Sequence, residues 1–493
     1  MLATLAAALL ASAAPQTSPA ETAPAPEAAH DWSALAVADV EAAYAETKAN
    51  HPGMFDSVNP AFPQLLETAR SEALALARRA STPGGFAASL ARFTAVLNDG
   101  HAGAYDVLPD RHEPPVRWPG FVAAWRGDAM YVHRAREGGP PAGSRIESCD
   151  GRPVTDLVRT NVFDWRSGVG VPGDWWSSAR RVFVDDGNPF VALPQTCRFV
   201  KGRAAQDRAL AWSPLPGDYQ QWRNAAINGD LLPIGLAERA QGINWIAMPD
   251  FSPDEAGVAA YQTLFADIEA KAGALRRGRA VVLDLRHNNG GSSLWSRRIA
   301  ELLWGKPAVE AARREASAKT RVLWRPTPGN LAEVRRFGDL IRAQGDAATA
   351  AIVDAFVPMF EAAVARGDTW LEEPDAPELP GQSTGDAVPL LTVPVYVVVP
   401  GQCASACLDA IDVFKLFPST RLIGAPSSAD STYMEVRSPE LPSGMARAII
   451  PMKVYVDRPR GNGVFYEPDI VMRDFDWSTG NFLKRIEEDL AQR

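Results

Sequence analysis

The hydrophobic and polar positions of this chain follow two different periods, and the change between them divides the chain. From Asp31 to about Leu97, apolar side chains recur at helical spacing, which predicts a small helical layer. Between about Pro115 and Thr160 the pattern changes to short runs separated by turns, and a hairpin is expected around Gly127-Asp128. The first half therefore predicts helices followed by a β-rich part.

The second half contains apolar runs that are too short for buried helices. A strand entering a turn is predicted from Ile243, and fully buried strands are predicted at Ala280–Leu285 and Val395–Val399. Helical periodicity follows the first two of these runs, at Ala256–Leu275 and at Leu294–Trp304. This alternation of strands and helices predicts an α/β fold class for the second half.

These patterns give four expected parts. Residues 1–30 are expected to be a signal peptide and linker, 31–110 a helical region, 111–240 a β-rich region with an irregular insert, and 241–493 the α/β core. A largely helical insertion, 306–385, interrupts the core. Insertions of this kind often form a lid or wall over a site.

The amino-terminal segment is rich in alanine and leucine, and a small-residue Ala11-Ser12-Ala13 site and a Pro/Ala/Thr/Glu tract follow it. This order is typical of a secretory signal peptide and a flexible linker, so we expect a periplasmic or secreted protein. The segment before the site holds no lysine or arginine, and a disordered alanine-rich tail is the alternative.

Composition narrows the classes of partner. The 493 residues carry a formal net charge of -9 and no dense run of lysine or arginine, which argues against nucleic acid as a partner. No other segment reaches the roughly 18 to 20 continuous apolar residues of a membrane-spanning helix. We therefore expect no membrane span.

Four cysteines in a chain of this length do not make a disulfide scaffold, but they allow two bridges in an oxidising compartment. Cys149 and Cys197 are one conceivable pair. Cys403 and Cys407 are either bridged, reduced and buried, or small residues packing a turn. No histidine lies near them in the sequence, so we expect neither a metal nor another cofactor.

Cys403 and Cys407 flank Ser405, the leading candidate for a catalytic nucleophile. Pro400-Gly401 ends the predicted strand, and a helical pattern follows. A serine at a helix amino terminus meets free backbone N–H groups and the positive end of the helix dipole, where an oxyanion is stabilised. The alternative is that Ser405 only caps the helix.

Two further stretches carry candidate chemistry. His101, in a turn after a helical segment, is one of only six histidines and is a candidate base for Ser405; the alternative is that it only interacts with the end of the helix dipole. The glycine pair Gly290-Gly291 ends a buried strand and lets backbone N–H groups approach a ligand. No phosphate-loop lysine follows it, so nucleotide binding is not indicated.

Together these stretches resemble the S41 peptidases, the family of the tail-specific or C-terminal processing proteases and of the tricorn core protease. The resemblance rests on four motifs, at Asp99–His101, Asp284–Gly291, Ser405, and Gly424–Pro426 with the later Pro468-Asp469. It implies a ClpP/crotonase-like core of stacked ββα units and serine attack on a peptide carbonyl.

The β-rich part, near residues 138–154, resembles the PDZ pattern of a small-residue loop, a strand and an Asp-Gly turn. PDZ domains take extended peptides as an added strand. A β-rich layer without a ligand is the alternative.

The resemblance also implies roles for individual residues. Ser405 is the expected nucleophile, and the N–H groups of Ala406 and of Gly290 or Gly291 are the expected oxyanion donors. The processing proteases use a lysine as base, and the position aligned with it here is an aspartate, Asp430.

His101 instead matches the histidine of the tricorn-like branch, which implies a Ser/His mechanism. A third group is expected to orient His101. Asp457 is the first choice, with Asp430 and Glu467 as alternatives.

The expected function is that of a serine-type endopeptidase or carboxy-terminal processing peptidase, acting on peptides or unfolded proteins. Two alternatives stay open on the same fold. One is a non-catalytic protein that binds peptides or hydrophobic ligands, and the other is an esterase or crotonase-like acyl enzyme, because the fold does not fix the chemistry.

Overall fold

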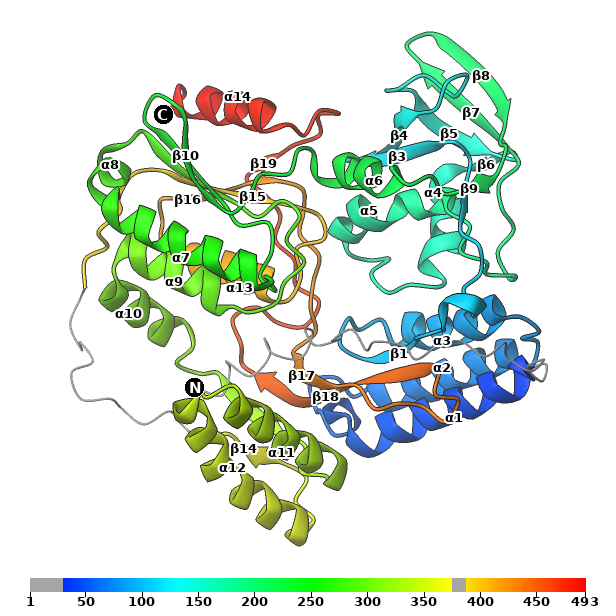
Figure 1. Cartoon of the computed structure of the whole chain (residues 1–493), viewed down its shortest axis with the longest axis horizontal. Helices are drawn as coiled ribbons and strands as arrows, with labels where there is room; N and C mark the ends of the chain where they lie inside the picture. Colours follow the sequence, from blue (N-terminus) through cyan, green and yellow to red (C-terminus); the bar gives the residue numbers. More distant parts are fainter. Residues whose placement is uncertain (1–29, 375–386) are drawn as a thin grey trace, which may run out of the picture.

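The computed structural model describes residues 30–374 and 387–493. The predicted signal peptide and the end of the predicted insertion lie outside these residues. The described chain combines helices with four separate sheets (Figure 1). The predicted mixed α/β class is confirmed; the finer assignments, a ClpP/crotonase-like core and a PDZ-like domain, stay predictions.

A central six-stranded sheet holds the predicted buried strands side by side. Strands β11, β12, β15, β16 and β19 run parallel, and β10 lies antiparallel at one edge. In sheet order the strands are β10 (Gly235–Ala240), β11 (Ile243–Ala247), β12 (Ala280–Asp284), β15 (Val395–Val399), β16 (Thr420–Gly424) and β19 (Ile470–Val471). Because β12 and β15 are parallel neighbours, their carboxyl ends lie side by side, and the turns that follow the two strands start next to each other.

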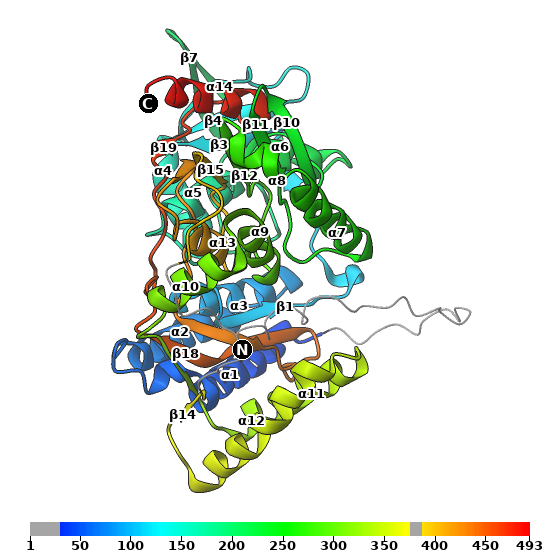
Figure 2. The same ribbon diagram turned by 90° about the vertical axis from the view of Figure 1, so that its left-hand side faces the viewer.

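Side chains alternate between the two faces of this sheet. Val395, Val397 and Val399 pack with the helices on one face, whereas Tyr396 and Val398 belong to the cluster on the other face. Helix α14 covers the second face, opposite α7, α9 and α13 (Figures 1 and 2). The helices are α7 (Glu255–Ala270), α8 (Ala272–Arg277), α9 (Leu294–Trp304), α10 (Lys306–Ala316), α13 (Ala406–Phe414) and α14 (Thr479–Leu490).

The predicted helical layer packs on a second, antiparallel sheet that is built largely from the carboxy-terminal half (Figure 1). Ala446, Ala448 and Ile450 of β18 pack among the apolar side chains of the helices. The carboxy-terminal part of the chain therefore packs against the amino-terminal helices. The elements are α1 (Trp32–Asn50), α2 (Phe62–Ala77), α3 (Pro83–Leu97), β1 (Gly103–Asp106), β17 (Tyr433–Arg437) and β18 (Ala446–Val456).

The insertion, predicted to be largely helical, also contributes strands to this second sheet. β13 (Arg321–Trp324) pairs with β18, and β14 (Leu371–Glu372) pairs with β13. Its two long helices are α11 (Pro328–Ala343) and α12 (Ala347–Arg366). By length and composition alone α12 could also span a membrane; in this structure its buried side chains pack with Trp324 and α11.

The β-rich region forms its own antiparallel sheet, and the predicted hairpin at Gly127-Asp128 joins its strands β3 and β4. Cys149 and Cys197 face each other on β5 and β7 and form a disulfide. The strands are β3 (Phe121–Arg126), β4 (Ala129–Ala135), β5 (Arg145–Cys149), β6 (Arg152–Pro153), β7 (Thr196–Lys201) and β8 (Ala204–Ala209), with β2 (Arg117–Trp118) and β9 (Ser213–Pro214) paired beside them.

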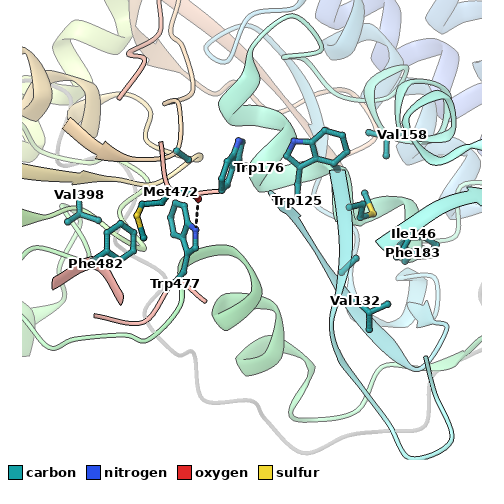
Figure 3. Close-up of a cluster of buried hydrophobic side chains, with 14 of the residues drawn as sticks. Trp125, Val132, Ile146, Val158, Trp176, Phe183, Val398, Met472, Trp477 and Phe482 are labelled. Atoms are coloured by element: carbon teal, nitrogen blue, oxygen red, sulfur yellow. Dashed lines mark hydrogen bonds between the residues drawn. The ribbon is translucent and has the colours of Figure 1, made fainter. Parts of the chain in front are cut away.

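Tryptophan side chains join this region to the central sheet. Trp176, on α5, lies 5.3 Å from Trp477 between ring centroids, and both belong to one buried cluster with Val398 of β15 (Figure 3). The helices of the region are α4 (Val154–Val158), α5 (Pro172–Ser178) and α6 (Tyr219–Asn228). The β-rich region is therefore packed against the core.

Candidate active site

The nucleophile turn, which we define as residues 400–406, connects strand β15 to helix α13 and carries Ser405. Ser405 has a φ of 54° and a ψ of -127°, a combination that residues other than glycine rarely adopt and that costs about 1 to 3 kcal/mol. Ser405 stands at the N-cap position of α13, but its side chain makes no capping hydrogen bond. A serine held in this way at a strand-to-helix turn presents its hydroxyl outward.

Two local interactions hold the nucleophile turn. Cys403 and Cys407 form a disulfide that brackets Ser405, and both cysteines are fully buried. The backbone N–H of Ser405 donates to Oδ2 of Asp430 at 2.8 Å. The position that aligns with the lysine base of the processing proteases thus holds the main chain of the nucleophile here.

A buried arginine extends this network to helix α13. Nη1 of Arg460 lies 3.4 Å from Asp430, its Nη2 lies 2.7 Å from Asp409, and its Nε lies 3.0 Å from Asp412. Burial alone would lower the pKa of the Arg460 guanidinium, but the three carboxylates outweigh burial and raise it. Arg460 therefore stays charged and ties the loop after β18 to helix α13 and to Asp430, which binds the Ser405 N–H.

Gly290, the first residue of the glycine pair, lies directly against the nucleophile turn, and Gly291 lies against Phe251. Gly290 has a φ of 103°, and a Cβ there would lie 2.8 Å from the carbonyl oxygen of Ala404 and 2.9 Å from Cβ of Ser405. Gly291 has a φ of 126°, and a Cβ there would lie 2.3 Å from the carbonyl oxygen of Phe251. Both positions require glycine, because side chains would collide with fixed backbone or with the nucleophile.

The N–H groups near Ser405 differ in their availability. The N–H of Gly290 donates to Oδ1 of Asn288 at 2.9 Å. Those of Gly291 and Ala406 donate no hydrogen bond within residues 30–374 and 387–493. Of the three predicted oxyanion donors, Gly291 and Ala406 are therefore the two with a free N–H.

His101 lies in a second turn, between helix α3 and strand β1, which we call the histidine turn (residues 98–102). Asn98 ends the helix in the left-handed conformation, and the His101 N–H donates to Oδ1 of Asp99 at 2.8 Å. Nδ1 of His101 is buried without a hydrogen-bond partner in the described chain. His101 and Ser405 share no hydrogen bond there either, and such contacts often tighten only when substrate binds.

Charge interactions place the two turns in one neighbourhood. Burial raises the pKa of the Asp99 carboxyl, whereas the His101 charge, the His101 N–H and the Ser431 hydroxyl oppose this shift. The Asp430 charge raises the same pKa further. Because Asp430 also binds the Ser405 N–H, the Asp99 carboxyl interacts electrostatically with groups in both halves of the site.

Sequence reasoning missed a further carboxyl, Glu435 on β17. Its φ of 54° marks an irregularity, because the neighbours on either side pair with β18 and Glu435 does not. Its side chain is buried and lies 3.3 Å from Nζ of Lys453. Burial raises the pKa of Glu435, and the Lys453 and His101 charges oppose that shift.

Alternation in the sequence predicts a different environment for this residue. Met434 and Val436 are apolar, so Glu435 between them is expected to face solvent, whereas the structure buries Tyr433, Glu435 and Arg437.

None of the acids predicted to orient His101 hydrogen-bonds to it in the described chain. Asp457 is exposed at the end of β18, where its carbonyl accepts from the hydroxyl of Thr320 at 3.3 Å. Glu467 is also exposed, and Asp430 binds Ser405 instead. The residues described also contain no group of three or more His, Cys, Asp or Glu side chains arranged to hold a metal ion.

Comparison with known proteins supports the fold. No family model and no curated protein matches the chain. Among solved structures, mature CPAF complexed with lactacystin has a TM-score of 0.64 and 14% sequence identity, over 93% of this chain and 98% of that chain.

A CPAF variant in which a serine is replaced by alanine gives a TM-score of 0.61 at 14% identity, over 93% of this chain and 97% of that chain. The tricorn protease is also found, over 93% of this chain and 37% of that chain at 12% identity, with a TM-score of 0.39 that is too low for an argument. The chain therefore has the S41 peptidase fold that its motifs predicted.

Proposed function

We propose that this protein is a serine-type peptidase in which Ser405 is the nucleophile and His101 the general base. One observation carries the proposal: a conformationally strained serine at a strand-to-helix turn lies against Gly290, and the N–H groups of Ala406 and Gly291, the residues next to Ser405 and Gly290, are free in the described chain. Nucleophile and oxyanion donors in this arrangement suit acyl transfer. The S41 resemblance and the CPAF fold support the same chemistry.

The proposed reaction follows from this geometry. Oγ of Ser405 attacks the scissile carbonyl while the His101 imidazole takes its proton, and the imidazolium then protonates the leaving amine. The N–H groups of Ala406 and Gly291 stabilise the oxyanion, at about 3 to 4 kcal/mol per donor where such donors have been removed. Water then releases the acyl group by the reverse proton transfers.

Two carboxylates have separate roles in this proposal. Asp430 positions the main chain of Ser405. Glu435, whose ionised form the buried Lys453 ammonium favours against the effect of burial, is the carboxyl that we propose stabilises the His101 imidazolium. This assignment replaces Asp457, which lies exposed beside Thr320.

The proposed substrates are peptides and unfolded proteins, with the β-rich region as a PDZ-like binding part. We also propose an exported protein, because all four cysteines are paired in two disulfides, as is usual in oxidising compartments. The endopeptidase and carboxy-terminal processing forms of the activity differ only in where along a substrate cleavage occurs.

The test compares wild-type protein with Ser405→Ala on a disordered protein substrate, together with labelling by a fluorophosphonate probe. We expect wild-type cleavage and labelling, and loss of both in the variant with unchanged circular dichroism. Ser419→Ala is the matched control, because this serine lies past the far end of α13 and its hydroxyl makes no hydrogen bond in the described chain. Equal turnover by wild type and Ser405→Ala would reject the proposal.

The same experiment distinguishes the alternatives. Turnover of small esters without peptide cleavage would support an esterase. Capture of peptides or hydrophobic ligands by a wild-type protein that never reacts with the probe would support a binding protein. Lactacystin, which CPAF binds, is a further probe of Ser405.

A further inference from the structure

The disulfide Cys403–Cys407 encloses only three residues, and the middle one is Ser405. Cys403 precedes the strained serine, and Cys407 is the second residue of helix α13. The bridge therefore spans the point at which the backbone leaves its ordinary conformation. No other covalent link in the described chain lies at the nucleophile turn.

The conformation that the bridge spans is not one that Ser405 adopts by preference. With an ordinary helical φ, Ser405 would extend α13 by one residue, and Oγ would rotate away from its present direction. Because Gly290 has no Cβ, Ser405 can lie against it, with Cβ of Ser405 2.9 Å from the position that a Cβ of residue 290 would take. Oγ is thus placed correctly only while the turn keeps its shape.

The bridge is poorly suited to a global stabilising role. A disulfide restricts the unfolded chain less when the loop it closes is shorter, and the separation is 4 residues here against 48 for Cys149–Cys197. Both sulfurs lie in an apolar cluster with Leu408 and Ile411, where small apolar side chains would also pack. The effect of the bridge therefore falls on the local shape of the turn.

We infer that Cys403 and Cys407 are positioning residues, whose disulfide fixes Ser405 in its reactive conformation, so that the enzyme is fully active only when this bridge is formed. The inference rests on the proposed peptidase function. It also assigns a role to the two cysteines that the sequence left open.

The test compares the double variant Cys403→Ala/Cys407→Ala with Cys149→Ala/Cys197→Ala, which removes the other bridge. For the first variant we expect fluorophosphonate labelling and kcat to fall by about 10- to 100-fold, with KM within about twofold, because small misplacements of a reacting group cost rates of this order. The second variant should keep its labelling rate within about twofold while its melting temperature falls more. Labelling of Cys403→Ala/Cys407→Ala at the wild-type rate would overturn the inference.

Hydrogen exchange of residues 402–409 provides a readout that does not depend on activity. We expect faster exchange in Cys403→Ala/Cys407→Ala than in the wild type, and unchanged exchange would overturn the positioning role. A wild-type protein that neither cleaves nor labels would reject the proposed peptidase, whereas the exchange comparison would still decide on the bridge.

If the double variant does not fold, wild-type protein is treated with graded dithiothreitol. Each reduced disulfide becomes two thiols as the reagent is oxidised, and the thiols are alkylated and located by mass spectrometry. Labelling should fall in proportion to the free thiols at 403 and 407. Labelling that persists after this bridge is reduced would overturn the inference.

Discussion

The nucleophile turn and the histidine turn each position one reactive side chain, but different interactions hold them. A disulfide, the Ser405 N–H bond to Asp430, and close contact with Gly290 fix the nucleophile turn. The histidine turn is held by hydrogen bonds alone: the His101 N–H donates to Oδ1 of Asp99, the Ala102 N–H to the Asp99 carbonyl, and the Gly168 N–H to Oδ1 of Asn98. Its imidazole Nδ1 has no partner in the described chain.

This difference shows where the site is preorganised. The nucleophile is fixed by covalent and hydrogen-bonded contacts that are already formed. The charge of the base interacts with the buried carboxyls of Asp99 and Glu435, whose pKa values burial raises, and Nδ1 of its ring has no hydrogen-bond partner in the described chain. Substitutions in the nucleophile turn should therefore lower kcat by displacing Ser405. Substitutions around His101 should lower kcat by changing its protonation or the charge near it.

The largest expected effect is on the base itself. His101→Gln removes the group that takes the Ser405 proton, so kcat on a disordered protein substrate should fall by about 10³-fold. His112→Gln, on a short helical turn further along, is the control and should keep wild-type activity. If His101→Gln cleaves substrate and labels at the wild-type rate, His101 is not the base, and the comparison between the turns loses its meaning.

A matched pair of glycine substitutions tests the geometric side. Gly290→Ala places a methyl group against Ser405 at a φ of 103°, and we expect kcat to fall by about 10²-fold because the nucleophile is displaced. Gly100→Ala, in the histidine turn, meets nothing within 4 Å and should change kcat by less than about twofold. Similar losses in both variants would show that the two turns are equally constrained.

Glu435→Gln tests the charge beside the base. We expect kcat to fall by about tenfold, because the imidazolium loses a nearby negative charge, and stability to fall by about 3 kcal/mol, because the buried Lys453 ammonium keeps only the more distant Glu373 carboxylate, at 3.8 Å. In Glu435→Gln/Lys453→Met the buried ammonium is also gone, so the melting temperature should recover while kcat should not. Recovery of both would assign Glu435 a purely structural role.

The sequence predicted those parts whose information is local. Val395–Val399 and Leu294–Trp304 were predicted to the residue, because short apolar runs and helical periodicity bounded by glycine or proline leave little ambiguity. Glu435 was missed, because its role depends on an irregular pairing with β18 and on Lys453 there.

Asp457 was predicted to orient His101 because the sequence does not show how the end of β18 is placed. Its place was judged from spacing to Pro468-Asp469, but β18 ends at Val456 and leaves Asp457 exposed beside Thr320. The direction in which a strand end points is set by sheet register, which the sequence does not reveal.

The smallest expected effect concerns a support of the nucleophile side from the β-rich region. A hydrogen bond from Oγ of Ser428 reaches Oδ1 of Asp174 at 2.7 Å, and a Cβ on Gly173 would lie 2.2 Å from the carbonyl oxygen of Ser427. The loop that carries Asp430 is therefore packed against helix α5. If the hydrogen bond between Ser428 and Asp174 contributes to folding, the unfolding free energy of the wild type should depend on the ionisation of Asp174.

Burial raises the pKa of Asp174 from 3.8 to about 7. Between these values the folded state keeps a proton that the unfolded state has lost, so wild-type stability should fall as the pH rises towards 7 and then level off. Asp174→Asn does not titrate, and from pH 5 to pH 8 it should gain about 2 kcal/mol relative to the wild type in urea unfolding. If the unfolding free energies of the wild type and Asp174→Asn change in parallel with pH, Asp174 is ionised in the folded protein. Its protonation then does not stabilise the contact between the β-rich region and the loop that carries Asp430.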